Sequence, residues 1–231
     1  MEGSLNNHNL NKLQINENNN NTSTNTSNIN IIESFNSKTI NEKEEKKIIK
    51  KISDLFSNIC QENTKKFKKE NNPIIKPFLS INPSISINDY LERLYKYSKM
   101  NISTMLLILI YIDRICNINK FKLTYYIIHK LILASMIVAI KYNEDDYFSI
   151  NTYAKLGGVQ KSEMIFLEYY FVTLIKFNLY VKNELFNKYE NYISSADSEE
   201  EEEECEEIED SPENSDNNDI NNVGNDNTNS V

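Results

Sequence analysis

Apolar residues recur at steps of three and four from Glu42 onward, which is the spacing of one face of an α-helix. In the first stretch of this kind, charged and polar residues alternate with five large apolar positions, Ile48, Ile52, Leu55, Phe56 and Ile59. The pattern predicts an amphipathic helix. Because its apolar face needs a surface to pack against, we expect this helix to be an N-terminal extension of a folded domain.

A second group of apolar stretches begins after a connection that contains three prolines, Pro73, Pro77 and Pro83. Ser86 then offers a side-chain oxygen that can accept a hydrogen bond from a free backbone N–H group, as N-cap residues do. The helix that it is predicted to cap has one apolar face, which consists of Ile87, Tyr90, Leu91 and Leu94.

Two stretches in the middle of the chain are apolar nearly all round. The segment "TMLLILIYIDRIC" predicts a helix that opens at Ser103 or Thr104, and the next predicted helix runs from Thr124 to about Tyr142. A helix that is apolar on nearly all sides belongs in the middle of a core. Charged residues interrupt both stretches, so we expect buried helices of a soluble bundle rather than membrane spans.

Two glycines predict the end of the following, shorter helix. Gly157 and Gly158 are adjacent, and glycine readily takes the left-handed conformation that closes a helix. A fifth helix is predicted from about Lys161 to Asn178, and the shorter piece "ELFNKYENYI" closes the domain. Alternating apolar runs bounded by turn residues are missing from the sequence, so no strand is predicted.

Composition separates this helical region from two polar ends. Residues 1–41 are rich in asparagine, and residues 194–231 contain fifteen acids without any lysine or arginine. We expect both ends to be disordered, because they have too little apolar surface to offset the entropy of ordering. Between them the predicted fold is all-α, with an N-terminal helix and proline-containing loop at residues 42–83 and a five-helix bundle at 84–193. The fifteen acids of residues 194–231 carry more negative charge than the formal net charge of −9 of the whole chain. The total charge therefore says nothing about partners.

The sequence offers little of the chemistry that an enzyme needs. A phosphate-binding loop requires several glycines, but the helical region has only the adjacent pair at 157 and 158. His8 lies in the asparagine-rich end and His129 lies on an apolar helix, so no two histidines are close in sequence. The three cysteines are widely spaced and predict neither a disulfide framework nor a metal site. We therefore expect no catalytic residue and no cofactor.

Three contiguous acids, Glu144, Asp145 and Asp146, follow the second long apolar stretch. Adjacent residues point their side chains in different directions, and the alternate spacing and glycine turn of a calcium loop are absent. The cluster is therefore interpreted as a solvated exit from a buried helix and not as a metal site.

The order of the predicted helices and the residues at their ends resemble a cyclin box. The residues that carry the resemblance are "SISINDYLERLYKYSKMNIS", "YIDRI", "HKLILASMIVAIKYNEDD", "YAKLGGVQKSEM" and "LEYYFVTLIKFNLYV". They stand in family order over roughly 140 residues and are most similar to the short, single-box P-type or U-type cyclins of the phosphate-signalling kind. The resemblance implies a regulatory subunit, without catalytic residues of its own, that binds and activates a cyclin-dependent serine/threonine protein kinase.

The resemblance also implies which residues contact the kinase. Lys141 matches the cyclin-box lysine at the end of the third helix, and Glu168 matches the glutamate of the fifth, which lie together on the kinase-facing surface in the family. The residues themselves allow a second interpretation, in which Lys141 and Glu168 pair with each other only for stability. Asp113 lies on a nearly all-apolar helix and needs a partner, for which Arg93 or Lys141 are the candidates. Lys130 stands where the group usually has an arginine.

Two rival functions remain open at this point: a helical adaptor that binds a partner without activating it, and a scaffold of the transcription-factor type. Nucleic-acid binding requires a concentrated basic stripe, and the basic residues of 84–193 are spread out. We therefore expect a protein kinase as the partner and not nucleic acid, a membrane or a small-molecule substrate. The expected location is intracellular, in the nucleus, the cytoplasm or both.

Overall fold

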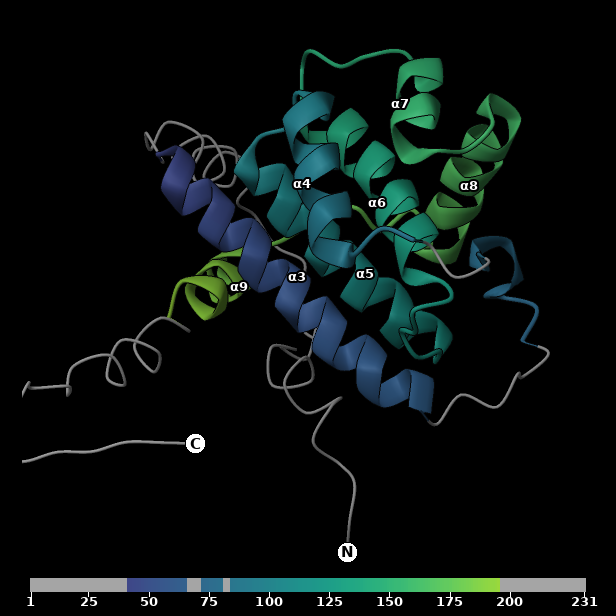
Figure 1. Ribbon diagram of the computed structural model, residues 1–231, viewed down its shortest axis with the longest axis horizontal. Coiled ribbons are helices and arrows are strands. Elements are labelled where there is room, and N and C mark those ends of the chain that lie inside the picture. Colours follow the sequence, from purple (N-terminus) through teal and green to yellow (C-terminus); the bar gives the residue numbers. More distant parts are fainter. Residues whose placement is uncertain (1–40, 66–71, 81–83, 196–231) are drawn as a thin grey trace, which may run out of the picture. The chain divides into compact units, whose positions relative to one another are not determined.

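The computed structural model describes residues 41–65, 72–80 and 84–195. All regular elements within these ranges are helical (Figure 1), which confirms the all-α prediction for this part of the chain. They are α3 (Glu42–Lys65), the short 3-10 helix η1 (Lys76–Phe78), α4 (Ile87–Ser98), α5 (Ile102–Asn119), α6 (Ile128–Asn143), α7 (Ile150–Gly157), α8 (Lys161–Leu174) and α9 (Asn183–Ser195). The disorder predicted for 1–41 and 194–231 concerns residues that lie almost entirely outside these ranges.

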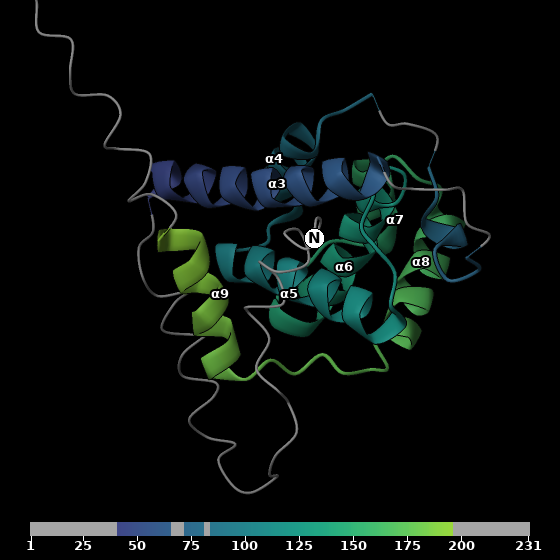
Figure 2. The same ribbon diagram turned by 90° about the horizontal axis from the view of Figure 1, so that it is seen from below.

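Helices α5 and α6 pack against each other at the centre of the bundle. Helix α8 contacts the far side of α6, α9 contacts α5, and α3 lies across α4 and α5 (Figures 1 and 2). Every residue from Ile102 to Ile115 is buried, as expected for a helix that is apolar on all sides. By length and composition α5 could also cross a membrane, but 78% of it is buried inside the bundle, so neighbouring helices already cover its apolar surface.

Two helices begin at other residues than the sequence predicts. Helix α5 starts at Ile102, because the Asn101 side chain accepts a hydrogen bond of 2.9 Å from the Thr104 N–H and takes the N-cap role predicted for Ser103 or Thr104. Helix α6 starts at Ile128 and not at Thr124. A turn precedes it, in which the Thr124 carbonyl accepts the N–H groups of Ile127 and Ile128 at 3.1 Å each.

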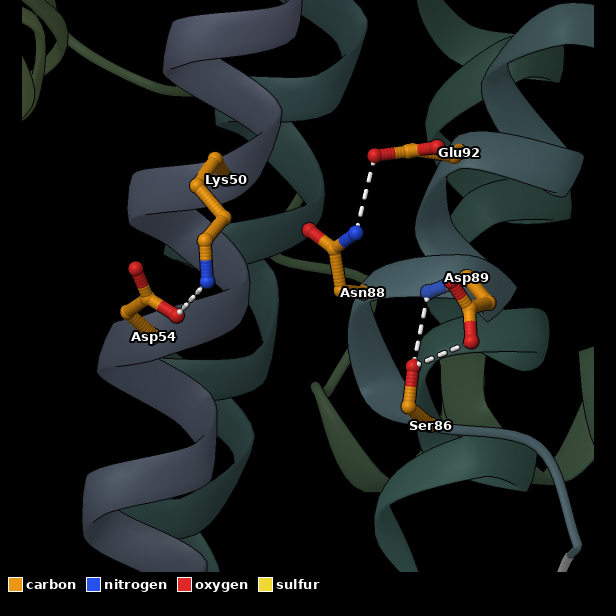
Figure 3. Close-up of polar contacts among 6 residues, drawn as sticks. All are labelled: Lys50, Asp54, Ser86, Asn88, Asp89 and Glu92. Atoms are coloured by element: carbon orange, nitrogen blue, oxygen red, sulfur yellow. Dashed lines mark hydrogen bonds and ion pairs between the residues drawn. The ribbon is translucent and has the colours of Figure 1, made fainter. Parts of the chain in front are cut away.

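Side-chain caps fix the starts of α3 and α4. Asn41 and Glu44 form a reciprocal capping box at α3, in which the Asn41 side chain accepts the Glu44 N–H at 2.9 Å. The prediction that Ser86 caps α4 is confirmed, since its hydroxyl oxygen accepts the Asp89 N–H at 3.0 Å (Figure 3). Figure 3 also shows the ion pair of Lys50 with Asp54, 2.6 Å long, on the solvent side of α3.

The buried face of α3 differs slightly from the predicted one. Ile52, Phe56 and Ile59 are buried as predicted. Ile49 is buried in place of Ile48, and Cys60 in place of Leu55, while Ile48 and Leu55 are only partly buried. The buried face is therefore rotated by a fraction of a turn from the predicted one, and it includes the small or polar residues Ser53, Cys60 and Asn63.

Gly157 and Gly158 have different roles at the end of α7. Gly158 is the C-cap with φ of 73°, which confirms the predicted helix stop. Gly157 has a packing role that the sequence did not predict: a Cβ atom there would lie 2.3 Å from Leu133 Cδ2, and Leu133 is fully buried in α6. The close approach of α7 to α6 therefore requires a residue without a side chain.

Replacing Gly157 with alanine is expected to destabilise the domain by about 1 to 3 kcal/mol, the usual cost of overpacking a core. Thermal unfolding measures the effect. Gly158→Asn is the matched control, because that position is open, with no atom within 4 Å of an added Cβ, and asparagine tolerates a left-handed backbone. Equal melting temperatures for Gly157→Ala and the unaltered chain would contradict the packing role.

Candidate functional site

The two residues that the resemblance assigns to kinase contact, Lys141 and Glu168, lie side by side on the rim of the bundle. Lys141 is in the last turn of α6 and Glu168 is in the middle of α8. The Lys141 Nζ and Glu168 Oε1 atoms are 2.6 Å apart, and the side chains are 38% and 21% exposed. The pair is thus formed in the free chain, yet both charged groups remain accessible to another molecule.

Large apolar side chains are exposed beside this ion pair. Tyr142 follows Lys141 directly and is half exposed. On α8, Ile165 lies one turn before Glu168, and Tyr169 follows Glu168 directly. This i, i+3, i+4 spacing places all three on one side of the helix. Tyr169 is 68% exposed. Exposed aromatic side chains are enriched in surfaces that bind other proteins.

The end of α8 differs from the prediction and adds another exposed aromatic residue. The helix ends at Leu174 and not at Asn178, because Lys176 and Phe177 both adopt left-handed backbone conformations, with φ of 57° and 56°. The Phe177 N–H donates to the Val172 carbonyl at 3.0 Å, so this residue folds back over the last turn of α8. Its side chain is 71% exposed.

Side chains of α5 hold this strained turn in place. The Tyr111 hydroxyl donates to the Leu179 carbonyl at 2.8 Å, and Arg114 Nη1 donates to the Asn178 carbonyl at 2.6 Å. Asn119 Nδ2 donates to the carbonyl of Leu174 at 3.2 Å. Consecutive left-handed residues other than glycine cost about 1 to 3 kcal/mol each and persist where surrounding contacts hold them. The sequence has no glycine at this helix end, so nothing in its local pattern predicted the turn.

A second lysine–glutamate pair joins the same two helices near their N-terminal ends. Lys130 Nζ, at the start of α6, lies 2.8 Å from Glu163 Oε1, in the first turn of α8. Lys130 is the residue that replaces the arginine usual in the resembling group. The Lys130 ammonium has a carboxylate partner but lacks the planar guanidinium of arginine.

The solvated exit predicted for the three contiguous acids holds for Asp145 and Asp146, which are exposed, but not for Glu144, which is only partly exposed. The Glu144 carboxylate accepts hydrogen bonds from the backbone and side chain of Asn101 and from the Thr104 hydroxyl. Asp146 Oδ2 lies 3.1 Å from Lys99 Nζ at the exposed surface. Within the described ranges, no group of three or more His, Cys, Asp or Glu residues is arranged to hold a metal ion.

The prediction that Arg93 or Lys141 is the partner of Asp113 was wrong. Its carboxylate accepts hydrogen bonds from the Tyr189 hydroxyl, 2.7 Å away on α9, and from Asn117 Nδ2 at 3.0 Å. Arg93 lies instead over the ring of Tyr90, with its Cζ atom 5.2 Å from the centroid. Asp113 therefore ties α5 to α9 through Tyr189, which is a structural role.

His129 has the structural environment that its place on an apolar helix suggested. It is buried, its Nε2 atom lies 3.1 Å from the Ile85 carbonyl oxygen, and its ring packs 5.1 Å from that of Tyr90. Burial lowers the pKa of His129 below its ordinary value. The side chain thus helps to fix α6 against the segment that leads into α4.

Comparisons with known proteins agree with the resemblance found in the sequence. A family model described as Cyclin matches residues 1–179. Cyclin-U4-1 of Arabidopsis thaliana is 36% identical over 117 residues, which cover 48% of this chain and 55% of the relative. Cyclin-P3-1 of Oryza sativa subsp. japonica is 36% identical over 107 residues, covering 46% and 45%. The PHO85 cyclin-like protein psl1 of Schizosaccharomyces pombe is 35% identical over 117 residues, covering 49% and 47%.

The names of two of these relatives are those of the U-type and P-type cyclins that the sequence resembles, and the third is named as PHO85 cyclin-like. The matches span about half the length of the curated relatives. The family model covers most of the chain and therefore shows the family. The partial matches to the relatives do not by themselves show the activity, substrates or partners of the whole protein.

Proposed function

The chain belongs to the cyclin family, and from this premise we propose that it is a regulatory subunit that binds and activates a cyclin-dependent serine/threonine protein kinase. Members of this family regulate a kinase and do not catalyse phosphate transfer themselves. We assign kinase binding to the box at residues 84–193, with α3 as the extension that completes the bundle.

The observation that best supports this proposal is the Lys141–Glu168 pair among exposed apolar side chains. Apolar groups such as Tyr169 supply area that a partner can bury, at about 25 cal/mol for each Å² removed from water. The ammonium of Lys141 and the carboxylate of Glu168 can form hydrogen bonds to partner groups, which sets the orientation of binding. Phe177, 71% exposed in the turn that follows α8, adds another apolar side chain that a partner could bury.

The name of one relative suggests the first kinase to test. The fission yeast protein is called PHO85 cyclin-like, so we propose a PHO85-type cyclin-dependent kinase as the partner of this chain. An intracellular location follows from the family, and we propose the nucleus, the cytoplasm or both as the compartment in which the complex forms.

Mixing the purified chain with a purified PHO85-type kinase tests the proposal directly. We expect the two chains to co-elute in size-exclusion chromatography and the kinase to phosphorylate a generic peptide substrate faster with the chain than without it. Failure to co-elute would contradict the proposal for this kinase class. Stable co-elution without faster phosphorylation would support the alternative function, a non-activating adaptor.

A further inference from the structure

Glu144 links the end of α6 to the start of α5. Its backbone N–H still belongs to α6, since it donates to the Ile140 carbonyl at 2.8 Å. Its carboxylate accepts the Asn101 backbone N–H at 3.0 Å and Asn101 Nδ2 at 3.1 Å. It also accepts the hydroxyl of Thr104. One residue therefore closes α6 and, at the same time, caps the N-terminal region of α5.

This contact is specific within the acidic cluster. Asn101 is the N-cap of α5, and a carboxylate near a helix N-terminus is stabilised by the free N–H groups and by the helix dipole. Asn143 reinforces the same contact, because its Nδ2 donates to Thr104 Oγ1 at 2.8 Å. Thr104 itself is fully buried, so the carboxylate is anchored to the core. Asp146, in contrast, pairs with the side chain of an exposed lysine, Lys99.

The anchored turn is the one that carries Lys141. The last carbonyl groups of a helix lack intrahelical partners, so terminal turns fray unless another contact holds them. Lys141 lies three residues before Glu144 and must stay in the helix for its ammonium to reach Glu168, 2.6 Å away. Fixing Glu144 to the start of α5 therefore fixes the position of the Lys141 backbone relative to the buried core.

We propose that Glu144 is a positioning residue for kinase docking: its carboxylate anchors the last turn of α6 to the N-terminus of α5 and thereby holds Lys141 beside Glu168. The kinase part of this inference rests on the proposed function. The anchoring part concerns this chain alone.

Amide hydrogen exchange and kinase affinity, measured on the full chain, test the two parts. In Glu144→Ala we expect exchange at residues 140–144 to rise about tenfold, as for loss of a helix cap, with little change in α8. We expect the dissociation constant for a PHO85-type kinase to rise about three- to tenfold, and the Glu144→Ala, Lys141→Ala double variant to bind only slightly more weakly than Lys141→Ala. Glu144→Gln, which keeps one acceptor oxygen, should show a smaller effect on both.

Ser86→Ala is the matched control, because it also removes a helix cap but does so at α4. A general loss of stability would weaken kinase binding equally in Ser86→Ala and Glu144→Ala, and that result would overturn the positioning role. Unchanged exchange at the end of α6, or fully additive effects of Glu144→Ala and Lys141→Ala, would overturn it as well. If the unaltered chain binds no kinase, the proposed function and the docking role fail together, and the exchange rates still decide whether Glu144 anchors α6.

Discussion

Replacing Ile52 and Phe56 together with aspartate is expected to lower the melting temperature by at least about 10 °C. Both side chains are fully buried on the face of α3 that meets the bundle. Loss of their burial costs about 1.5 to 3 kcal/mol each, and each kcal/mol shifts the melting temperature of a domain of this size by about 2 to 4 °C. Unpaired carboxylates in an apolar environment add a further penalty.

Thermal unfolding followed by circular dichroism measures this effect, and Asn58→Asp is the matched control. Asn58 lies on the exposed side of the same helix, so its variant adds a carboxylate without placing it in the core. Surface changes of this kind usually alter stability by less than about 0.5 kcal/mol. If the double variant melts like the unaltered chain and only kinase binding falls, α3 is an interface element and its burial in the bundle is not needed for stability.

The features that the sequence predicted correctly are those set by local patterns. Three- and four-residue spacing predicts all four apolar positions of α4 that are buried, and three of the five predicted for α3, because a helix repeats every 3.6 residues. The cap at Ser86 and the stop at Gly158 follow from the chemistry of single residues. These signals are short-range, so they survive in a single sequence.

The features that the sequence could not predict depend on residues far apart in the chain. The carboxylate of Asp113 accepts a hydrogen bond from Tyr189, which lies 76 positions later in the chain. Arg93 was a candidate partner because it is charged, but the sequence does not show which side chains packing brings together. The left-handed turn at Phe177 depends on Tyr111 and Arg114, which approach from α5. The Lys141–Glu168 pairing was suggested by a family resemblance, because helical periodicity alone cannot show which residues of α6 and α8 meet.

Lys141→Ala and Glu168→Ala are each expected to weaken kinase association at least tenfold while leaving helical content and melting nearly unchanged. An exposed ion pair contributes only about 0 to 1 kcal/mol to the stability of the free chain, and Lys141 is 38% exposed. In a complex the same groups lose water. Truncation of one member of a desolvated pair typically costs about 2 to 5 kcal/mol of binding, and about 1.4 kcal/mol corresponds to tenfold in the dissociation constant.

The Lys130–Glu163 pair provides the matched control for this experiment. It joins the same two helices with the same residue types and a similar distance, 2.8 Å against 2.6 Å. A role in holding α6 to α8 predicts similar effects for Lys130→Ala and Lys141→Ala. A role in kinase contact predicts that only substitutions at Lys141 and Glu168 raise the dissociation constant, and that Lys130→Ala changes stability slightly and binding little.

The Lys141→Ala, Glu168→Ala double variant completes the test. Because each single variant leaves the other charge without its partner in the interface, the double variant should cost less binding energy than the sum of the two. Titration of each variant against a purified PHO85-type kinase gives the four dissociation constants that this comparison needs. Strictly additive losses would mean that the two residues contact the kinase independently. Unfolding of Lys141→Ala would instead show that the pair serves the stability of the bundle, and kinase docking would have to be assigned to another surface.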